Sequence, residues 1–312
     1  MTYGLPYQGS KSRIAPWVLD HLPRARTLYE PFCGGCAITH CAMERGQYER
    51  FVLNDTRPTA AFFKKCAEGG MRNETRWISR DDFFKLKDTY MYVRMCFSFG
   101  NDGRTYAYSR KVEPYKKACH YAIVFDKWSE LFETAPEIAT ACHEACNGVA
   151  GMHERRLVFK RGLLKALKAL GRDRYKSSVN FHECTSVEHR IDTKTPACLE
   201  SLERLERLQS LQSLESLETQ RGDYRNLAMD DADGVIYCDP PYKNAKGYDA
   251  KFDHDAFHEW CLEQKLPVYI SEYSMPEDRF DCIAEVGVTR KFSDSKATRC
   301  HERLYVPKGR AR

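Results

Sequence analysis

GVIYCDPPY, residues 234–242, passes from a run of apolar residues directly into an acid, two prolines and a tyrosine. The run is rich in β-branched and aromatic residues, and prolines cannot donate hydrogen bonds to a β ladder. We therefore expect a buried strand that delivers Asp239 to the edge of a sheet. The prolines then hold the Asp239 side chain, the Pro240 carbonyl and the Tyr242 ring in place. An ordinary double-proline turn is the alternative, and the buried strand before it argues against that interpretation.

Other segments of the chain alternate between strand and helix patterns. Strand-like segments lie within residues 26–30, 49–56, 266–274, 286–295 and 301–308, and helical stretches include residues 16–21 and 254–263. Strands that alternate with helices predict an α/β domain with a largely parallel sheet. Residues 69–196 interrupt this pattern with few strand signals, and residues 154–171 have leucines near helical spacing. We expect an α/β core formed by residues 1–68 and 197–312, interrupted by a mostly helical domain at 69–196.

Composition excludes some classes of protein. The 312 residues are 42% hydrophobic and 30% charged, which is typical of a soluble chain, and no apolar run is long enough to span a membrane. No export signal is evident, so we expect an intracellular protein whose fourteen cysteines are reduced. Cys33 and Cys36 have zinc-ligand spacing but no matching second pair, so we expect no metal site.

Positive charge is concentrated in one segment. Residues 150–180 contain nine Lys or Arg and two Asp or Glu, so nine minus two gives +7, more than the +5 of the whole chain. A focused basic segment is typical of a protein that binds a polyanion. A solvated basic helix face is the alternative.

Two further motifs suggest a nucleotide-like ligand. EPFCGGC, residues 30–36, follows a strand and precedes a helix, and Gly34 and Gly35 allow close approach of the backbone to a ligand. About 20 residues later, Asp55 ends the next strand, where a carboxylate can bind both hydroxyls of a ribose. A plain tight turn and a helix N-cap are the alternatives for the two motifs.

The segment that ends in Asp239 suits chemistry on an aromatic amino group. Such a nitrogen is a poor nucleophile because its lone pair is conjugated. Hydrogen bonds from its N–H groups to the Asp239 carboxylate and the Pro240 carbonyl favour tetrahedral geometry and expose the lone pair, while Tyr242 can stack on the base. A methyl donor on the opposite side then allows in-line transfer.

These motifs, in this order, resemble the Dam-type (D12 class, alpha-group) DNA adenine-N6 methyltransferases. YQGSK (7–11), EPFCGGC (30–36), Asp55, GDY (222–224) and CDPPY (238–242) carry the resemblance, and Cys36 stands where the family often has a small residue such as glycine. The resemblance implies a Rossmann-like, S-adenosylmethionine-dependent core and an inserted target-recognition domain. It implies catalytic roles for Asp239, Pro240, Pro241 and Tyr242. It implies cofactor binding by Tyr7, Lys11, Glu30, Pro31, Phe32, Gly34, Gly35, Asp55, Asp223, Tyr224 and Asp239.

Flipping a base out of duplex DNA costs a few kcal/mol, so the protein must bind the DNA tightly enough to offset this cost. Residues 97–111 resemble the family's loop that enters DNA beside the target base; Arg104 could read guanine, and Tyr106 or Tyr108 could fill the vacated space. Aromatic side chains that join the core of the inserted domain are the alternative. The candidate DNA-binding residues are Asn101, Arg104, Tyr106, Tyr108, Arg110, Lys111, Arg155, Arg156, Lys160, Arg161, Arg290, Lys291 and Lys296, the last three on a predicted hairpin that could also be an ordinary charged edge.

Residues 198–218, CLESLERLERLQSLQSLESLE, have a leucine at every third position. A step of three turns the apolar stripe by about −60° each time on an α-helix, so no single coiled-coil seam persists. We expect the first half to be a helix packed on the core sheet. The last triplets should leave helical geometry and continue into the strand that leads to Asp223 and Tyr224.

Together these features predict a site-specific enzyme that moves a methyl group from S-adenosylmethionine to N6 of an adenine in double-stranded DNA. We expect a bacterial or phage-type monomer that binds no membrane, with two copies on a palindromic site as the alternative. It would stand alone or form the modifying half of a restriction pair. A catalytically inactive DNA-binding protein with the same fold, and a methyltransferase for RNA or a protein amide, are the rival hypotheses.

Overall fold

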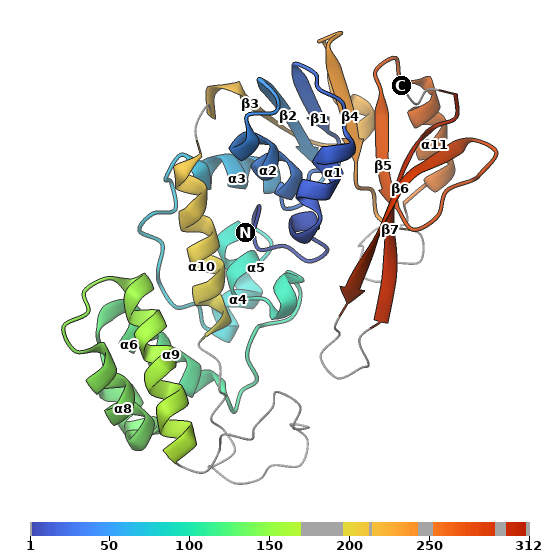
Figure 1. Cartoon of the computed structure of the whole chain (residues 1–312). Coiled ribbons are helices and arrows are strands. Elements are labelled where there is room, and N and C mark those ends of the chain that lie inside the picture. The colour runs from blue at the N-terminus through green and yellow to red at the C-terminus, as the bar shows by residue number, and fades with distance from the viewer. Residues whose placement is uncertain (1, 170–195, 212–213, 243–251, 291–297, 310–312) are drawn as a thin grey trace. The chain divides into compact units, whose positions relative to one another are not determined.

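The computed structural model describes residues 2–169, 196–211, 214–242, 252–290 and 298–309 (Figure 1). Contacts divide the chain into two compact units, one formed by Met1–Asn73 with Arg204–Arg312 and the other by Glu74–Glu203. The sequence placed the two boundaries at 68/69 and 196/197. One unit therefore interrupts the other in sequence, and each is described below by itself.

The first unit is built on a seven-stranded sheet with the order β3-β2-β1-β4-β5-β7-β6. Its strands are β1 (Thr27–Glu30), β2 (Arg50–Asp55), β3 (Leu217–Arg221), β4 (Gly234–Cys238), β5 (Val268–Glu272), β6 (Phe280–Arg290) and β7 (Thr298–Pro307). The strands from β3 to β5 pair in parallel, whereas β7 is antiparallel to β5 and to β6. The prediction of a largely parallel α/β sheet is confirmed, and every segment predicted as a strand contains one.

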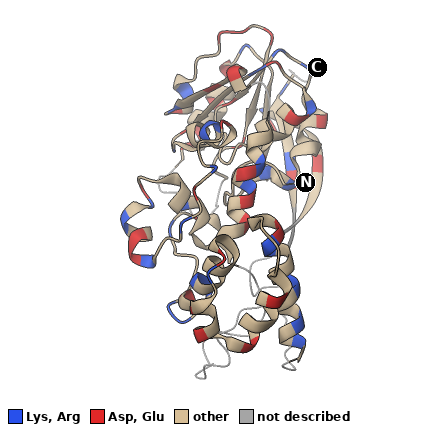
Figure 2. Cartoon of the chain, turned by 90° about the vertical axis from the view of Figure 1, so that its left-hand side faces the viewer, with Lys and Arg blue, Asp and Glu red and all other residues tan. Residues whose placement is uncertain are grey.

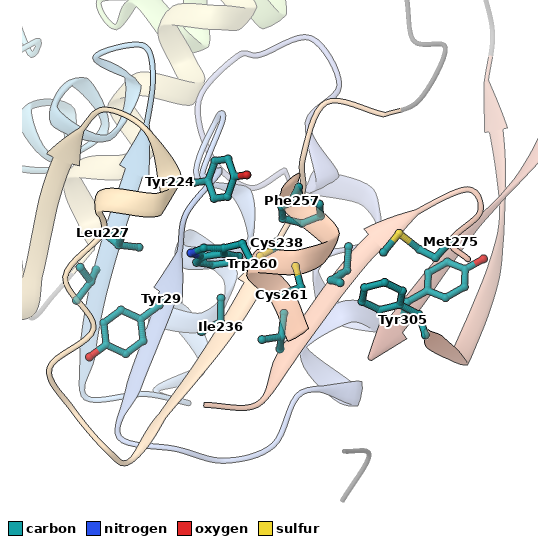
Figure 3. Close-up of a cluster of buried hydrophobic side chains, with 14 residues drawn as sticks. Tyr29, Tyr224, Leu227, Ile236, Cys238, Phe257, Trp260, Cys261, Met275 and Tyr305 are labelled. Atoms are coloured by element: carbon teal, nitrogen blue, oxygen red, sulfur yellow. The ribbon is translucent and has the colours of Figure 1, made fainter. Parts of the chain in front are cut away.

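Apolar residues cover both faces of the sheet. The helices of this unit are α1 (Ala15–His21), α2 (Ala37–Arg45), α3 (Thr59–Ala67) and α11 (His254–Glu263), with short 3₁₀ turns at Lys11–Arg13 and Tyr224–Asn226. Phe257, Trp260 and Cys261 of α11 pack against one face, where Tyr29 and Ile236 belong to the same buried cluster (Figure 3). Side chains alternate along a strand, so their neighbours Leu28, Val235 and Tyr237, also buried, point to the opposite face.

The second unit is helical in its described part. It contains α4 (Arg80–Leu86), α5 (Met91–Cys96), α6 (Glu113–Phe125), α7 (Ser129–Thr134), α8 (Pro136–Cys146), α9 (Met152–Ala169) and the first turns of α10 (Ala197–Arg207). A single antiparallel bridge between Ser98 and Tyr106 closes the loop that follows α5. None of the helices that the structure describes, in either unit, is long and apolar enough to cross a membrane.

The leucine-rich segment changes conformation along its length, as expected. Helix α10 ends at Arg207, a 3₁₀ turn follows at Leu208–Ser210, Leu211 is extended, and a second 3₁₀ turn leads into β3 at Leu217. One uninterrupted helix over this segment is therefore excluded. The 3₁₀ turn at Leu208–Ser210 lies against α3, and the packing of α10 itself on the sheet remains a prediction.

The last turn of α10 anchors the N-terminal segment. The guanidinium of Arg204 donates hydrogen bonds to the carbonyl oxygens of Tyr3 (3.0 Å), Gly4 (3.3 Å) and Leu5 (2.9 Å). Leu5 N in turn donates to Gly35 O at 2.7 Å. A Cβ at Gly4, whose φ is +71°, would lie only 2.3 Å from that same oxygen of Gly35. The segment before the first helix is thus held directly against the turn that contains Gly34 and Gly35, called the glycine turn below.

Gly4→Ala is expected to destabilise the protein by about 2–5 kcal/mol, because left-handed backbone strain and a clash with backbone atoms act together. Gly9→Ala is the matched control, since Gly9 has φ +79° and no atom within 4 Å of its virtual Cβ. That variant should lose only about 1–2 kcal/mol. Denaturant unfolding measures both, and equal losses would show that the close approach of Gly4 to Gly35 does not hold the segment.

Candidate active site

Three acids gather at one edge of the sheet because three neighbouring parallel strands end there. Glu30 ends β1, Asp55 ends β2, and Asp239 directly follows β4. Strand β1 lies between the other two and pairs in parallel with each. In open α/β sheets this carboxyl edge is where ligands bind. The arrangement brings together the three acids to which the sequence assigned chemistry.

The glycine turn between β1 and α2 is bound to Asp55. Gly34 has φ +48°, and its N–H donates to Asp55 Oδ2 at 2.9 Å, while Arg57 N–H donates to Asp55 Oδ1 at 3.0 Å. Asp55 does not cap α3, which begins at Thr59, so that alternative is excluded. A Cβ at Gly35 would lie 2.7 Å from Tyr7 Cβ, so glycine is required for the N-terminal segment to close over the turn.

Cys33 and Cys36 do not form a metal site with other residues in the described structure. No group of three or more His, Cys, Asp or Glu side chains in the described ranges is placed to hold a metal ion. Both thiols are buried, and burial raises the pKa of each. Cys36 takes a left-handed conformation with φ +55°, where the glycine found in the resembled family would be unstrained. Cys36 thus takes up, within the glycine turn, a backbone conformation that glycine adopts more easily.

The Asp239 carboxylate lies beside a lysine from the N-terminal segment. Lys11 Nζ lies 2.7 Å from Asp239 Oδ1 and 3.1 Å from Glu302 Oε1. The same ammonium lies 4.5 Å from the centre of the Tyr242 ring, and the Tyr242 hydroxyl donates a hydrogen bond to Glu302. The four side chains come from three separate segments of the first unit, since Asp239 and Tyr242 share the turn after β4. Lys11, predicted as a donor-binding residue, thus lies in contact with the predicted catalytic acid.

Charges in this cluster are strongly coupled. Burial would lower the pKa of Lys11, but the carboxylates of Asp239 and Glu302 outweigh burial and raise it. Burial is the main cause that raises the pKa of Asp239; Lys11 opposes this effect and Glu302 adds to it. The Asp239 side chain keeps 22% of its surface exposed, whereas that of Glu302 keeps 3%. Asp239 is therefore the member of the cluster that a substrate can reach.

Aromatic rings surround the predicted catalytic segment after β4. Tyr242 is buried and meets the Tyr273 ring edge-on, with centroids 4.7 Å apart. Pro240 is buried and Pro241 is half-buried, so the side chains packed around these two prolines hold the turn after β4 in place. Stacking of Tyr242 on a base remains a prediction, and in this arrangement Lys11 lies against the ring.

A second aromatic group lies near the glycine turn. The rings of Phe32 and Tyr224 have centroids 4.9 Å apart, and Tyr224 also packs against Phe257 and Trp260 (Figure 3). Asp223 caps the short turn that carries Tyr224 and pairs with Arg225. Phe32 is only partly buried, so the ring of Phe32 can contact a ligand at this edge.

Glu30 is a buried acid whose charge is strongly disfavoured. Burial raises the pKa of Glu30 from 4.5 to about 8, the hydroxyl of Thr39 opposes this rise through its hydrogen bond, and the nearby Asp239 charge adds to it. Pro31, the next residue, offers its carbonyl to Asn54 Nδ2 at 3.0 Å. Glu30 is thus a proton-holding group next to the Asp239 cluster.

The second unit corrects part of the predicted DNA-binding set. The Tyr106 ring is buried and its hydroxyl donates to Ile78 O at 2.8 Å. The Tyr108 ring is buried as well and stacks on Trp77 with centroids 5.2 Å apart. The prediction that either tyrosine fills a gap in DNA is therefore wrong, because both belong to the core of this unit. The exposed aromatic residue of the loop is Phe99, at 59% exposure.

Several predicted phosphate-binding residues also have structural partners. Arg155 is only 6% exposed, and its guanidinium donates to the carbonyl oxygens of Ile123, Val149 and Ala150, so its assignment to DNA is wrong. Arg156 is mostly buried against Glu203 and Glu200. Asn101 donates to Met95 O at 2.7 Å and to Ser201 Oγ at 3.4 Å. The sequence could not tell which face of a helix or loop is turned inward.

Other members of the set remain on the surface. Arg104, Arg110, Lys111, Lys160 and Arg161 are exposed. Lys291 and Lys296 lie outside the described residues, and of Arg290 only the backbone, at the end of β6, is described. Figure 2 shows Lys and Arg interspersed with Asp and Glu along the described helices.

The comparisons with known proteins agree with the motifs. Residues 7–133 match the D12 class of N6 adenine-specific DNA methyltransferases. No curated protein matches the chain. The match covers Tyr7, Lys11, the glycine turn and Asp55, and it confirms the resemblance to the D12 class inferred from the motifs, while Asp239 and Tyr242 lie beyond the matched range. The seven-stranded mixed sheet is consistent with a methyltransferase fold.

Sequence reasoning missed Glu302, which lies within the strand-like segment HERLYVPK. A charged residue in such a strand usually faces solvent, as its neighbours His301 and Arg303 partly do. Glu302 instead faces inward, next to Lys11 and Tyr242. Because side chains alternate along a strand, Glu302 shares a face of β7 with the buried Leu304 and Val306, and this alternation was the available signal for its orientation.

Glu30→Gln tests the state of the buried acid. The folded protein holds a proton on Glu30 up to pH of about 8, whereas the unfolded chain releases it near pH 4.5, so this group lowers stability as pH rises between those values. The variant cannot titrate at this position, so it should gain about 1–3 kcal/mol relative to the wild type between pH 5 and pH 8. Denaturant unfolding across this range measures the difference. The exposed Glu68→Gln should follow the wild-type pH dependence, and a Glu30→Gln curve parallel to the wild type would contradict the assignment.

Proposed function

We propose that this protein transfers a methyl group from S-adenosylmethionine to N6 of an adenine in double-stranded DNA. The observation that carries the proposal is the position of Asp239. It directly follows β4 at the carboxyl edge of the sheet, keeps 22% of its side-chain surface exposed, and lies 2.7 Å from Lys11 Nζ. The match of residues 7–133 to adenine-specific DNA methyltransferases supports the same substrate class. A flipped-out base would present its amino group to that carboxylate.

Several residues at the carboxyl edge of the sheet have properties that fit the binding of S-adenosylmethionine, the methyl donor. S-adenosylmethionine, when bound, supplies a methyl group on a positively charged sulfur. Asp55 could accept hydrogen bonds from the ribose hydroxyls, and the half-buried Phe32 ring could lie against the adenine of the donor. The buried Asn54 Oδ1 has no hydrogen-bond partner among the described residues, whereas Asn54 Nδ2 donates to Pro31 O and Gly222 O. An unsatisfied acceptor at this edge fits a ligand rich in N–H groups.

Asp239 has a defined part in the proposed step. It accepts a hydrogen bond from the substrate amino group, which favours tetrahedral nitrogen and frees its lone pair. The lone pair forms the new N–C bond, and the electron pair of the broken S–C bond stays on sulfur. The nitrogen is then acidic, and one of its protons leaves, so no separate general base is needed before methyl transfer. The nearby carboxylate stabilises the positive charge that develops on nitrogen.

The exposed bases of the second unit would bind phosphates. Lys160 and Arg161 lie with Lys165 and Lys168 on exposed positions of α9, and Arg104, Arg110 and Lys111 are exposed in and after the loop that contains Phe99. Contacts of this kind carry no sequence information, and binding should weaken steeply with salt. Phe99 replaces Tyr106 and Tyr108 as the aromatic candidate for contact with unpaired bases.

The proposed reaction is tested by incubating the protein with labelled S-adenosylmethionine and duplex DNA of mixed sequence, followed by nucleoside analysis. N6-methyladenine is expected, and none on any duplex, or preferential labelling of structured RNA, would contradict the proposal. Asp239→Ala should lower transfer by about a hundredfold or more while donor affinity changes little. Asp55→Ala should weaken donor binding instead, so the two variants serve as controls for each other in calorimetry.

Phe99→Ala tests the aromatic contact with DNA. Base–aromatic stacking contributes about 1–3 kcal/mol per base, so affinity for a duplex with one unpaired adenine should fall about fivefold or more. Phe84→Ala is the matched control, because Phe84 is 51% exposed on α4 of the same unit and outside the loop. Fluorescence anisotropy measures both, and equal effects of the two variants would remove Phe99 from the DNA contact.

A further inference from the structure

Glu302 is a buried carboxylate in contact with two other members of the active-site cluster. It lies on β7, opposite Val286 of β6, and only 2% of its surface is exposed. Glu302 Oε1 lies 3.1 Å from Lys11 Nζ and accepts the hydrogen bond of the Tyr242 hydroxyl. A buried carboxylate is costly unless it is paired, so these contacts are what make the position tolerable for an acid.

Lys11 is shared between two carboxylates. Its ammonium lies 2.7 Å from Asp239 Oδ1 and 3.1 Å from Glu302 Oε1, so one positive charge faces two negative ones. The other titratable groups near this cluster in the described structure are Glu30 of β1, Tyr237 of β4, Tyr242, and Tyr273, which follows β5. None of these four groups adds a positive charge, so among the described residues it is Lys11 that compensates both acids.

The position of Lys11 creates a conflict with the proposed reaction. Lys11 pairs with Oδ1 of Asp239, the carboxylate to which a substrate amino group would have to bind. A positive charge held there would also oppose the positive charge that develops on the substrate nitrogen. A shift of Lys11 away from Asp239 would relieve this opposition, provided that the buried ammonium keeps a counter-ion.

We propose that Glu302 is a positioning residue that receives Lys11 when the substrate amino group binds Asp239. The inference rests on the proposed function. Lys11 Nζ already lies within ion-pair distance of Glu302, so the transfer needs a small side-chain movement. The Tyr242 hydroxyl, bonded to the same carboxylate, keeps the ring oriented during the exchange.

Glu302→Gln separates this role from simple packing. Glutamine keeps the shape and can still accept the Tyr242 hydrogen bond, but it cannot hold Lys11 as a counter-ion. Lys11 should then stay on Asp239, and kcat should fall about tenfold or more, while KM for the donor changes little. An unchanged kcat in a folded variant would overturn the role of Glu302.

The pH dependence of the reaction is a second measurement, because a purely structural role of Glu302 would not shift it to lower pH. In Glu302→Gln the negative charge of Glu302 is gone and Lys11 pairs with Asp239 alone. Both changes should lower the pKa of Asp239. The acidic limb of kcat/KM should therefore move to lower pH by about one unit even though the rate falls. Glu302→Asp keeps the charge and should leave this limb near its wild-type position. A limb that stays in place in Glu302→Gln would overturn the proposal.

Glu285→Gln is the matched control. Glu285 lies on β6 of the same hairpin and pairs at the surface with Arg303 and His301. This variant should keep the wild-type kcat and pH profile. If the wild-type protein transfers no methyl group, the proposed function fails and the exchange of Lys11 fails with it. If the wild type is active and Glu302→Gln matches Glu285→Gln, only the role of Glu302 is overturned.

Discussion

The ion pair between Lys11 and Asp239 is the interaction on which the arrangement of the candidate active site depends. It joins a 3₁₀ turn near the N-terminus to the turn after β4, which are separated by more than two hundred residues in sequence. Because the ammonium is also close to Glu302 and the Tyr242 ring, the pair connects three segments of the first unit at once. A strand that ended in Asp239 without Lys11 would carry an uncompensated, poorly solvated charge.

The N-terminal segment must be held firmly for Lys11 to reach Asp239. Arg204 binds three consecutive carbonyl groups of this segment, and Gly4 approaches Gly35 so closely that no side chain fits. The same glycine turn donates to Asp55. The proposed donor site and the proposed catalytic acid are therefore parts of one connected structure, in which backbone contacts position the side chains.

Local patterns predicted the strands, the glycine turn and the change of conformation in the leucine-rich segment, because these depend on residues close in sequence. Tyr106, Tyr108 and Arg155 were misassigned because burial of a loop or helix face depends on partners distant in sequence, such as Trp77 and Ile123. Glu302 was missed for the same reason: the residues that make it a buried acid lie in other segments of the chain. The match to the D12 class confirmed the resemblance over residues 7–133. For the motifs after residue 133, the interpretation depends on their positions in the structure.

The most direct test of the account is a crystal structure with duplex DNA and a donor analogue that has no transferable methyl group. The account predicts that the N6 nitrogen of an extrahelical adenine lies within hydrogen-bond distance of Asp239, and that Lys11 has moved from Asp239 to Glu302. A structure in which Lys11 remains on Asp239 while the adenine amino group binds elsewhere would contradict it.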